Sequence, residues 1–360
     1  MTPTPTPAAG RPRPPAMSDV AARAGVSHQT VSRVLNDHPS VRPETRERVV
    51  AAIAALGYRR NTAARALVTR RSGTIGVMTT GSPYFGPSST LIAVEEAARE
   101  YGYFVSVATL TVFDQGGVSR AIEHFLSQAV EGVIVIAPHA EVRDALTPYV
   151  DEVPLVTIAA GFAEGLGVHT MSVDQNLGAR LATRHLLDLG HRTVTHLAGP
   201  QDWLDARARV EGWRAELAEA GAPEGELIAG DWSADCGYSV GLELARHGAP
   251  TAVFAANDQL ALGLLRAFNE SGVSVPGDVS VVGFDDIMGA AHFIPPLTTV
   301  QQDFSALGHR CLEMLRSAMA GEVLDHTPVV PHLVIRASSG PAPDRSSGSP
   351  HRKARLSSAS

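Results

Sequence analysis

Residues 19–36 have the sequence DVAARAGVSHQTVSRVLN, the pattern of two short helices joined by a tight turn. Ala21 is small enough for two helices to cross at it, Gly25 suits the turn, and Val31 can anchor the second helix in a core. These offsets are typical of a helix-turn-helix, in which the second helix enters the major groove of DNA. The alternative for the same residues is an ordinary pair of helices with a solvent-facing surface.

Signals for helix starts and ends predict three short helices around this stretch. Ser18 and Ser27 are the predicted N-caps of the first two, since a serine hydroxyl accepts a hydrogen bond from a backbone N–H of the first turn. The second helix is predicted to end near Leu35. Pro43 suits the first turn of a third helix and Gly57 its end. Between them one apolar face is formed by Val49, Ile53 and Leu56.

The charge of the chain is unevenly divided. Residues 1–72 contain 12 arginines, no lysine and four acidic residues, a net charge of +8, whereas the rest carries 18 basic and 33 acidic residues, a net charge of −15. A basic head on an acidic body points to nucleic acid as a partner. A solvated basic face would have the same composition, so the charge supports the motif without replacing it.

Several classes of protein are excluded by what the sequence lacks. The two cysteines, Cys236 and Cys311, are far apart, which fits a reducing cytoplasm and not a disulfide scaffold. No run of ~18 apolar residues is present to span a membrane, and the Thr- and Pro-rich first residues lack the apolar stretch of a secretory signal. The histidines lack metal-ligand spacing and no glycine-rich phosphate loop occurs, so neither a metal nor a cofactor is expected.

From residue 73 onwards, short apolar runs alternate with amphipathic helical stretches. This alternation predicts an α/β fold with parallel sheets covered by helices on both faces, long enough to form two similar lobes. The predicted strands are residues 74–78, 104–108, 132–136, 155–159, 193–197, 251–255 and 280–283.

Residues 19–36, with residues 45–49, 57–58 and 61–67 after them, resemble the headpiece and hinge of the LacI family of transcriptional regulators, and the resemblance continues to about residue 340. It implies an all-α helix-turn-helix headpiece joined to a two-lobed, doubly wound parallel-sheet domain of the periplasmic-binding-protein type. Together with the composition, it divides the chain into a disordered tail at 1–16, a headpiece at 17–60, a hinge helix and linker at 61–72, an effector-binding and dimerisation domain at 73–340, and a disordered tail at 341–360.

The resemblance implies that His28, Gln29 and Arg33 contact base edges from the recognition helix. A glutamine can bond adenine, and an arginine guanine, through two hydrogen bonds each. A well-studied family member has Tyr where this chain has His28, so we expect a different operator sequence. Short polar side chains around the helix suit phosphate contacts: Ser27, Thr30, Ser32 and Asn36.

Residues 61–68 resemble the family's hinge helix. Asn61 can cap it, small residues such as Ala64 let two such helices approach each other in a minor groove, and Leu67 corresponds to an apolar wedge that unstacks a base step. A helix of about eight residues is unstable alone, so it is expected to form only on DNA beside a partner hinge. The alternative for Leu67 is a buried core residue. Arg60 stands where the family usually has Pro.

Polar residues follow several predicted strands, at the edge where open α/β sheets bind ligands. Arg209, Asn257 and Asp285 supply donors and acceptors for sugar hydroxyls, and Trp232 offers a flat apolar face for a sugar ring. The resemblance assigns effector binding to these four residues and adds Phe304 as a pocket aromatic. Helix capping and turn formation are the alternative roles of Asn257 and Asp285.

Two positions depart from the well-studied member, which has Ser and Asp where this chain has Asp205 and Ala159. The resemblance favours a galactoside as the effector, and the two departures argue for a somewhat different pattern of hydroxyls. A purine or nucleoside is the alternative effector for the same architecture.

These features predict a cytoplasmic, nucleoid-associated homodimer that binds double-stranded operator DNA, represses a carbohydrate-utilisation operon, responds to a sugar and is not an enzyme. A sugar-binding transport protein would share the lobes but would not carry residues 18–67. A hydrolase could use Ser239, which lies in a G-x-S-x-G match at residues 237–241. However, Ser233 or Asp235 is predicted to cap a helix through residues 236–246, which would place Ser239 inside that helix.

Overall fold

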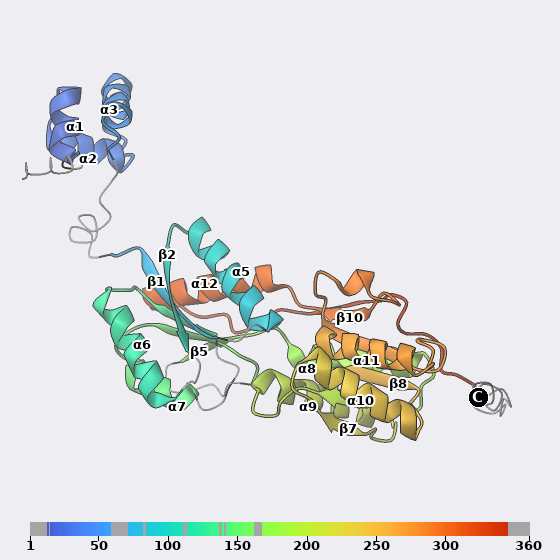
Figure 1. Cartoon of the computed structure of the whole chain (residues 1–360). Helices are drawn as coiled ribbons and strands as arrows, with labels where there is room; N and C mark the ends of the chain where they lie inside the picture. The colour runs from blue at the N-terminus through green and yellow to red at the C-terminus, as the bar shows by residue number, and fades with distance from the viewer. Residues whose placement is uncertain are drawn as a thin grey trace, which may run out of the picture. The chain divides into compact units, whose positions relative to one another are not determined.

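The structure, a computed structural model, describes residues 13, 15–58, 71–81, 84–110, 114–136, 139, 142–161 and 168–344. The chain divides into two compact units, Met1–Ser72 and Gly73–Ser360 (Figure 1). Most of both predicted tails, and the predicted hinge from Asn61 to Arg70, lie outside the described residues. No helix within the described ranges is long and apolar enough to cross a membrane.

Within its described residues, the first unit has three helices around a small core: α1 (Met17–Ala24), α2 (His28–Leu35) and α3 (Pro43–Leu56). Gly25 has a φ of +64° in the turn between α1 and α2, a conformation that favours glycine. Val31 is fully buried and Ala21 nearly so. The helix-turn-helix geometry predicted from the spacing of these residues is therefore confirmed.

The start of α1 differs from the prediction that Ser18 caps it. The helix begins at Met17 and its N-cap is Ala16. Asp19 takes the capping role, because its Oδ2 accepts the Ala16 N–H at 2.7 Å. A carboxylate at the third helical position can reach back to the N-cap in this way, so Ser18 was the wrong choice. The predicted roles of Ser27, Pro43 and Gly57 at the other helix ends are confirmed.

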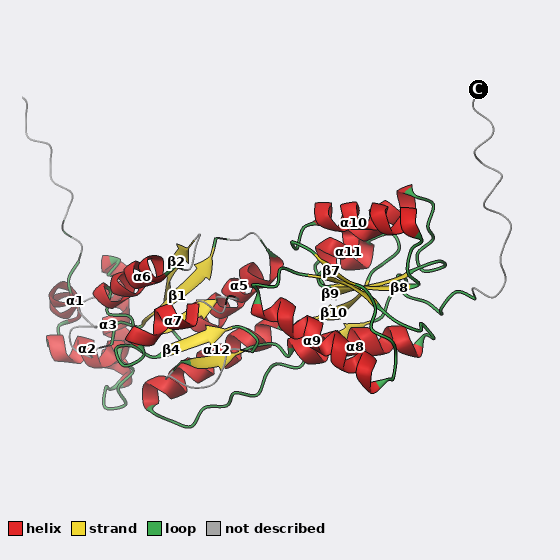
Figure 2. Cartoon of the chain, turned by 90° about the horizontal axis from the view of Figure 1, so that it is seen from below, coloured by secondary structure: helices red, strands yellow, loops and turns green. Residues whose placement is uncertain are grey.

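The second unit contains two lobes, each a sheet with helices on both faces (Figure 2). The sheet of the first lobe is entirely parallel, in the order β2-β1-β3-β4-β5. Its strands are β1 (Thr74–Thr80), β2 (Phe104–Leu110), β3 (Val133–Ile136), β4 (Leu155–Ile158) and β5 (His169–Met171). Its helices are α5 (Phe85–Glu100), α6 (Gln115–Ser127), α7 (Val142–Leu146), the short η1 (Thr147–Tyr149) and α12 (Phe304–Ala320).

Alternate residues of each central strand point to opposite faces of this sheet. Val133 and Val135 of β3 pack in the cluster that contains residues of α6 and α7, whereas Ile134 and Ile136 pack in the cluster that contains residues of α5 and α12. A strand covered on both sides is apolar throughout, and this explains why β3 could be recognised as a continuous apolar run.

The second lobe has a six-stranded sheet in the order β11-β10-β9-β8-β6-β7. Its strands are β6 (Thr195–Ala198), β7 (Leu227–Ala229), β8 (Ala252–Ala255), β9 (Ser280–Asp285), β10 (Thr298–Gln301) and β11 (His332–Val334). Its helices are α8 (Gln175–Asp188), α9 (Leu204–Glu219), α10 (Ala234–His247), α11 (Asp258–Glu270) and the short η2 (Ala290–His292).

Of the strands described in the two lobes, four were not predicted, and one of these four corrects the expected topology. β5, β7 and β11 have three residues each, too few for a period-2 pattern to be seen, and β10 was also missed. β11 pairs antiparallel with β10, so the second sheet is mixed where parallel sheets were expected. An antiparallel edge strand on an otherwise parallel sheet is common in such folds.

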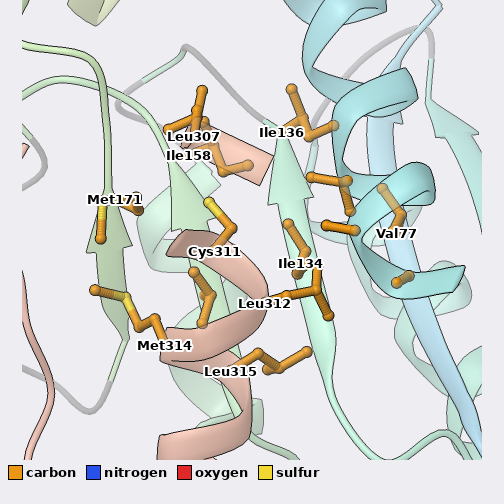
Figure 3. Close-up of a cluster of buried hydrophobic side chains, with 14 of the residues drawn as sticks. Val77, Ile134, Ile136, Ile158, Met171, Leu307, Cys311, Leu312, Met314 and Leu315 are labelled. Carbon is orange, nitrogen blue, oxygen red and sulfur yellow. The ribbon is translucent and has the colours of Figure 1, made fainter. Parts of the chain in front are cut away.

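α12 follows β10 of the second lobe in sequence but packs on the first lobe. Figure 3 shows Cys311, Leu312 and Leu315 of this helix among side chains of the first sheet, and Figure 1 shows the helix beside α5. The chain therefore crosses between the lobes near residues 172–174, 302–303 and 329–331. Two of the crossings are joined, because the Val329 N–H donates to the Ser172 carbonyl at 2.9 Å.

Candidate functional site

α2 has one buried face and one exposed face. Val31 and Val34 are buried in the core of the first unit, whereas His28, Gln29 and Arg33 are exposed. Residues 28 and 29 lie in the first turn of the helix and residue 33 lies one turn later, so their side chains are available to a partner that meets the exposed face near the start of the helix. This is the part of a recognition helix that reaches base edges.

The short polar residues around α2 have mixed surroundings. The Ser27 Oγ accepts the Thr30 N–H at 3.1 Å and lies 2.9 Å from the Thr30 Oγ1, so these two residues cap the helix together. Ser32 is half-buried and Asn36 is exposed at the end of the helix. The hinge candidates Asn61, Ala64 and Leu67 lie outside the described residues.

A cavity lies between the two lobes of the second unit. It has about 690 Å³ of space not filled by protein atoms, including its solvent-filled mouth. The side from the first lobe is mostly apolar and the side from the second lobe is mostly polar. All five residues predicted to bind the effector line it: Arg209, Trp232, Asn257, Asp285 and Phe304.

Arg209, on α9, is a buried cation in the cavity wall. Its Nε donates to the Gln175 Oε1 at 2.9 Å and its Nη1 donates to the Ala256 carbonyl oxygen. Its guanidinium carbon lies 3.7 Å from the ring centre of Phe284. Burial lowers the pKa of Arg209, and the neighbouring carboxylates of Asp285, Asp205 and Asp258 oppose that shift.

Two glutamines connect Arg209 to Asp285. The Gln175 Nε2 donates to the Gln302 Oε1 at 2.8 Å, and the Gln302 Nε2 donates to the Asp285 Oδ1 at 2.7 Å. The Arg209 Nη2 lies 3.8 Å from the same Asp285 oxygen, which is an ion-pair distance and too long for a hydrogen bond. These four side chains form a closed polar ring that holds Arg209 and Asp285 at the cavity.

Burial raises the pKa of the carboxyl groups at and beneath the cavity wall. Burial raises the pKa of Asp285 to about 6, although Arg209 and the Gln302 amide oppose it. Asp258 is buried behind it. Burial and then the charge of Asp285 raise the pKa of Asp258 to about 8, against hydrogen bonds from Thr299 and the Ile287 N–H.

Asn257 combines the two roles considered for it. Its Oδ1 accepts the Leu260 N–H at 2.8 Å and caps α11, while its Nδ2 donates to the Trp232 carbonyl at 3.0 Å. It also lines the cavity. Capping therefore positions this side chain at the wall and does not exclude contact with a ligand.

Trp232 is more covered than the sequence suggested. Only 5% of it is exposed, and its backbone has a φ of +72°. Gly199 lies against the indole, since a Cβ at that position would come within 2.2 Å of it. Trp203 packs edge-on against it with ring centres 5.6 Å apart. Trp203, which the sequence analysis missed, also lines the cavity. Its position shortly after the end of β6 was the only local feature of the sequence that could have marked it as a cavity residue.

Asp205 and Ala159, the two departures noted from the sequence, both line the cavity. The Asp205 Oδ1 accepts the N–H of Ala160, in the other lobe, at 2.9 Å. Burial raises the pKa of Asp205, while the charge of Arg209 and the Ala160 N–H lower it. At the mouth, the Tyr84 hydroxyl donates to the Asp231 carbonyl at 3.1 Å, a second contact between the lobes.

The Ser239 alternative is not supported by the structure. Ser239 lies inside α10, which Ser233 caps, and its hydroxyl donates to the Asp235 carbonyl one turn earlier at 3.0 Å. A nucleophile elbow requires a strand-to-helix turn. In the described part of the chain no cluster of three or more His, Cys, Asp or Glu side chains is arranged to hold a metal ion.

Known proteins share both units of this chain. Residues 16–61 match the bacterial regulatory proteins of the lacI family, and residues 183–339 match the periplasmic binding protein-like domain. The sequence is 34% identical to the lactose operon repressor of Escherichia coli (strain K12) over 339 residues, 94% of each chain.

Solved structures agree with these matches. The lac repressor dimer bound to operator and the anti-inducer ONPF has a TM-score of 0.81 with this chain, at 34% identity, covering 91% of this chain and 100% of that one. The complex of the transcriptional regulator CelR with cellobiose has a TM-score of 0.65 at 33% identity, covering 90% of this chain and 100% of that one.

Proposed function

The chain belongs to the LacI family of bacterial regulatory proteins, and we propose that it is a repressor that binds double-stranded operator DNA and releases it when a sugar or glycoside occupies the cavity between its lobes. As a member of a family of transcriptional regulators, it is not an enzyme. The regulated genes are proposed to be a carbohydrate-utilisation operon. The repressor acts in the cytoplasm as a homodimer, with one headpiece on each half of a near-palindromic site.

The exposed face of α2 supports the DNA-binding part of this proposal. Gln29 and Arg33 are exposed, and their side chains can each make two hydrogen bonds to one base, adenine and guanine respectively. His28 beside them would contribute to the choice of operator. Phosphate contacts from Ser27, Thr30, Ser32 and Asn36 would set the orientation of the helix without reading sequence.

The hinge remains a proposal based on sequence alone. Asn61 would cap the hinge helix, Ala64 would allow close approach of the partner hinge, and Leu67 would wedge between base pairs. Such a helix forms only when DNA and a partner are present, because so short a helix has little stability alone.

The observation that carries the effector assignment is the convergence of Arg209, Asn257 and Asp285 with aromatic rings on one cavity. Together they offer fixed donors and acceptors beside apolar faces, the combination that a sugar's hydroxyls and C–H surfaces require. Trp203 adds an aromatic face beside the largely covered Trp232. We propose a galactoside as the first ligand to test.

Effector binding would act by stabilising one arrangement of the lobes. Residues of both lobes line the cavity, so a bound sugar favours the closed arrangement by its difference in affinity for the two states. If closure misaligns the paired hinges, the affinity for the operator falls.

The test follows operator release by fluorescence anisotropy while galactosides, glucosides, pentoses and nucleosides are added. The parent protein should release its operator with a sugar. Arg209→Ala should bind the operator normally and fail to respond, because lost hydrogen bonds to a charged group weaken binding by about 1.5–3 kcal/mol each. Arg214→Ala is the matched control, since Arg214 lies on the same helix, is paired with Glu224 and is half exposed.

Two results would contradict the proposal. An Arg209→Ala protein that responds like the parent would show that the effector binds elsewhere. Release by a purine or nucleoside and by no sugar would leave the repressor and replace its effector class.

A further inference from the structure

The charged side chains on the cavity wall are unbalanced. Among the residues that line it in the described ranges, the charged ones are two acids, Asp205 and Asp285, and one base, Arg209. Two donors of that base are already used within the protein, on Gln175 and the Ala256 carbonyl. The wall therefore offers carboxylates in excess of cationic donors.

Asp205 is held in place at the wall by the opposite lobe. It lies in the first turn of α9 and is partly exposed. Its Oδ1 accepts the N–H of Ala160, a residue of the first lobe, at 2.9 Å. Its Oδ2 makes no hydrogen bond to any residue that the structure describes. A carboxylate with one oxygen fixed and the other oxygen available is suited to accept a hydrogen bond from a ligand hydroxyl.

The helix ends near the polar wall do not restore a preference for anions. A helix N-terminus attracts negative charge, but the first turns of α9 and α11 already contain Asp205 and Asp258. These two helix starts therefore already carry an acidic side chain of their own.

We propose, on the basis of the function proposed above, that Asp205 determines the class of sugar that binds: an uncharged sugar or glycoside that donates a hydroxyl to this carboxylate, with phosphorylated and acidic sugars excluded. A neutral sugar gains a hydrogen bond to a charged acceptor, which is stronger than one to a neutral acceptor. An anionic sugar instead faces two carboxylates across a buried wall, where repulsion is poorly screened.

Burial already raises the pKa of both acids, that of Asp285 to about 6. An added negative charge would raise the pKa of each further, whereas a donated hydroxyl would lower it. The same two carboxyls therefore favour one class of ligand and oppose the other.

The test is calorimetry of the full-length protein with two matched sets: galactose, 6-O-methylgalactose, galactose 6-phosphate and galacturonate, and the corresponding glucose compounds. The parent should bind a neutral sugar of one set at least about 100-fold more tightly than its phosphate or uronate. The 6-O-methyl sugar is substituted at the same oxygen as the phosphate but is uncharged, so any loss of affinity that it shows measures added size and the lost hydroxyl donor, and the further loss with the phosphate measures charge.

Asp205→Asn keeps an oxygen for the Ala160 N–H and removes the charge. This variant should bind the neutral sugar about tenfold or more weakly than the parent, because it loses a hydrogen bond to a charged acceptor. The ratio of the affinity for the neutral sugar to that for the phosphorylated sugar should fall by at least as much. Glu211→Gln is the matched control, because Glu211 is an exposed acid on the same helix and does not line the cavity. It should bind both classes as the parent does.

The proposal is overturned if the parent binds the phosphate or uronate as tightly as the neutral sugar, or if the 6-O-methyl sugar is rejected as strongly as the phosphate. It also falls if Asp205→Asn, or Asp205→Ser should the first variant not fold, leaves the ratio unchanged. The comparison within the parent needs no variant. Operator release by a phosphorylated sugar would refute this inference and leave the sugar-responsive repressor intact, whereas binding of no sugar would refute both.

Discussion

His196 illustrates how strongly one buried side chain depends on its surroundings. Its ring stacks on Phe254 with ring centres 4.5 Å apart, and its Nδ1 lies 2.9 Å from the Phe254 carbonyl oxygen. Since a carbonyl only accepts, Nδ1 carries the proton. Nε2 is buried with no hydrogen-bond partner, so a proton there would have no acceptor. Burial lowers the pKa of His196 to about 4, and the charges of Arg209 and Arg214 act in the same direction.

We therefore expect the second unit to lose stability on acidification. The unfolded chain binds a proton at His196 near pH 6.5, whereas the folded chain binds it only near pH 4. The contribution of His196 to the free energy of unfolding is therefore complete above pH 6.5 and is lost as the pH falls towards 4. It amounts to at most about 3 kcal/mol. Urea unfolding between pH 7.5 and 4 should show a shallower decline in His196→Gln than in the parent. The exposed His247→Gln is the control, and an equal slope in both variants would contradict the assignment.

Gln29 and Arg33 allow base reading to be separated from charge. Each alanine variant should lose about 1–3 kcal/mol of operator binding, the value of a two-bond base contact. Gln29→Ala should leave binding to random DNA unchanged, because Gln29 carries no charge. Arg48→Ala, an exposed arginine on α3, controls for charge alone. Gel shifts on operator and random DNA make the comparison, and a Gln29→Ala loss that is the same on both DNAs would exclude base reading.

At the scale of elements, α12 is the helix whose packing partner is hardest to predict from its position in the sequence. It follows β10 of the second lobe, yet Leu312 and Leu315 are fully buried against the first sheet (Figure 3). Gly132 of the first lobe lies so close that a Cβ there would come within 2.7 Å of Leu315. The helix therefore completes the core of the first lobe.

Leu312→Ala should lower the free energy of unfolding by about 2–5 kcal/mol, the usual cost of a cavity at a buried leucine. Val323→Ala is the matched control, because Val323 is 97% exposed just beyond the helix, and it should change stability by less than about 0.5 kcal/mol. The measurement is chemical denaturation followed by circular dichroism. If Leu312→Ala were as stable as the control, the packing of α12 on this sheet would be misassigned.

At the scale of the whole molecule, the second unit consists of two lobes that share their connections. The crossing at Ser172–Asp174 is paired with Val329, through hydrogen bonds of 2.9 Å in both directions. The Asp205 and Tyr84 contacts then join the lobes on the cavity side. A ligand in the cavity adds contacts to both lobes at once.

We expect such a ligand to stabilise the second unit and not the headpiece. At about 100 times its dissociation constant it should add about 2.7 kcal/mol to the free energy of unfolding. Hydrogen exchange with and without a binding sugar should show increased protection in α8, α9 and α12, and none in α1–α3. Equal protection in the headpiece in the absence of DNA would argue against two independent units.

Local chemistry in the sequence determined the parts of this protein that depend on neighbouring residues. The three headpiece helices were recognisable because the residues at their ends act through hydrogen bonds and dihedral angles within a turn of chain, as Ser27, Gly25, Pro43 and Gly57 do. The start of α1 was misplaced because Ser18 and Asp19 are both residues that can cap a helix, and Asp19 is the one that does so. Continuous apolar runs such as β3 were recognisable because burial on both faces leaves no polar position. The five effector-binding residues assigned from the family resemblance then all lined a single cavity.

The tertiary structure alone decided which distant residues meet. Gln175 and Gln302 are 127 residues apart, and nothing local marks either as a link between Arg209 and Asp285. The contact of Asp205 with Ala160 likewise exists only because two lobes face each other. Short edge strands such as β11 owe their pairing to β10 and not to any pattern of their own. Such contacts depend on the closure of long loops, whose outcome is set by the packing of whole elements and leaves no periodic trace in the sequence.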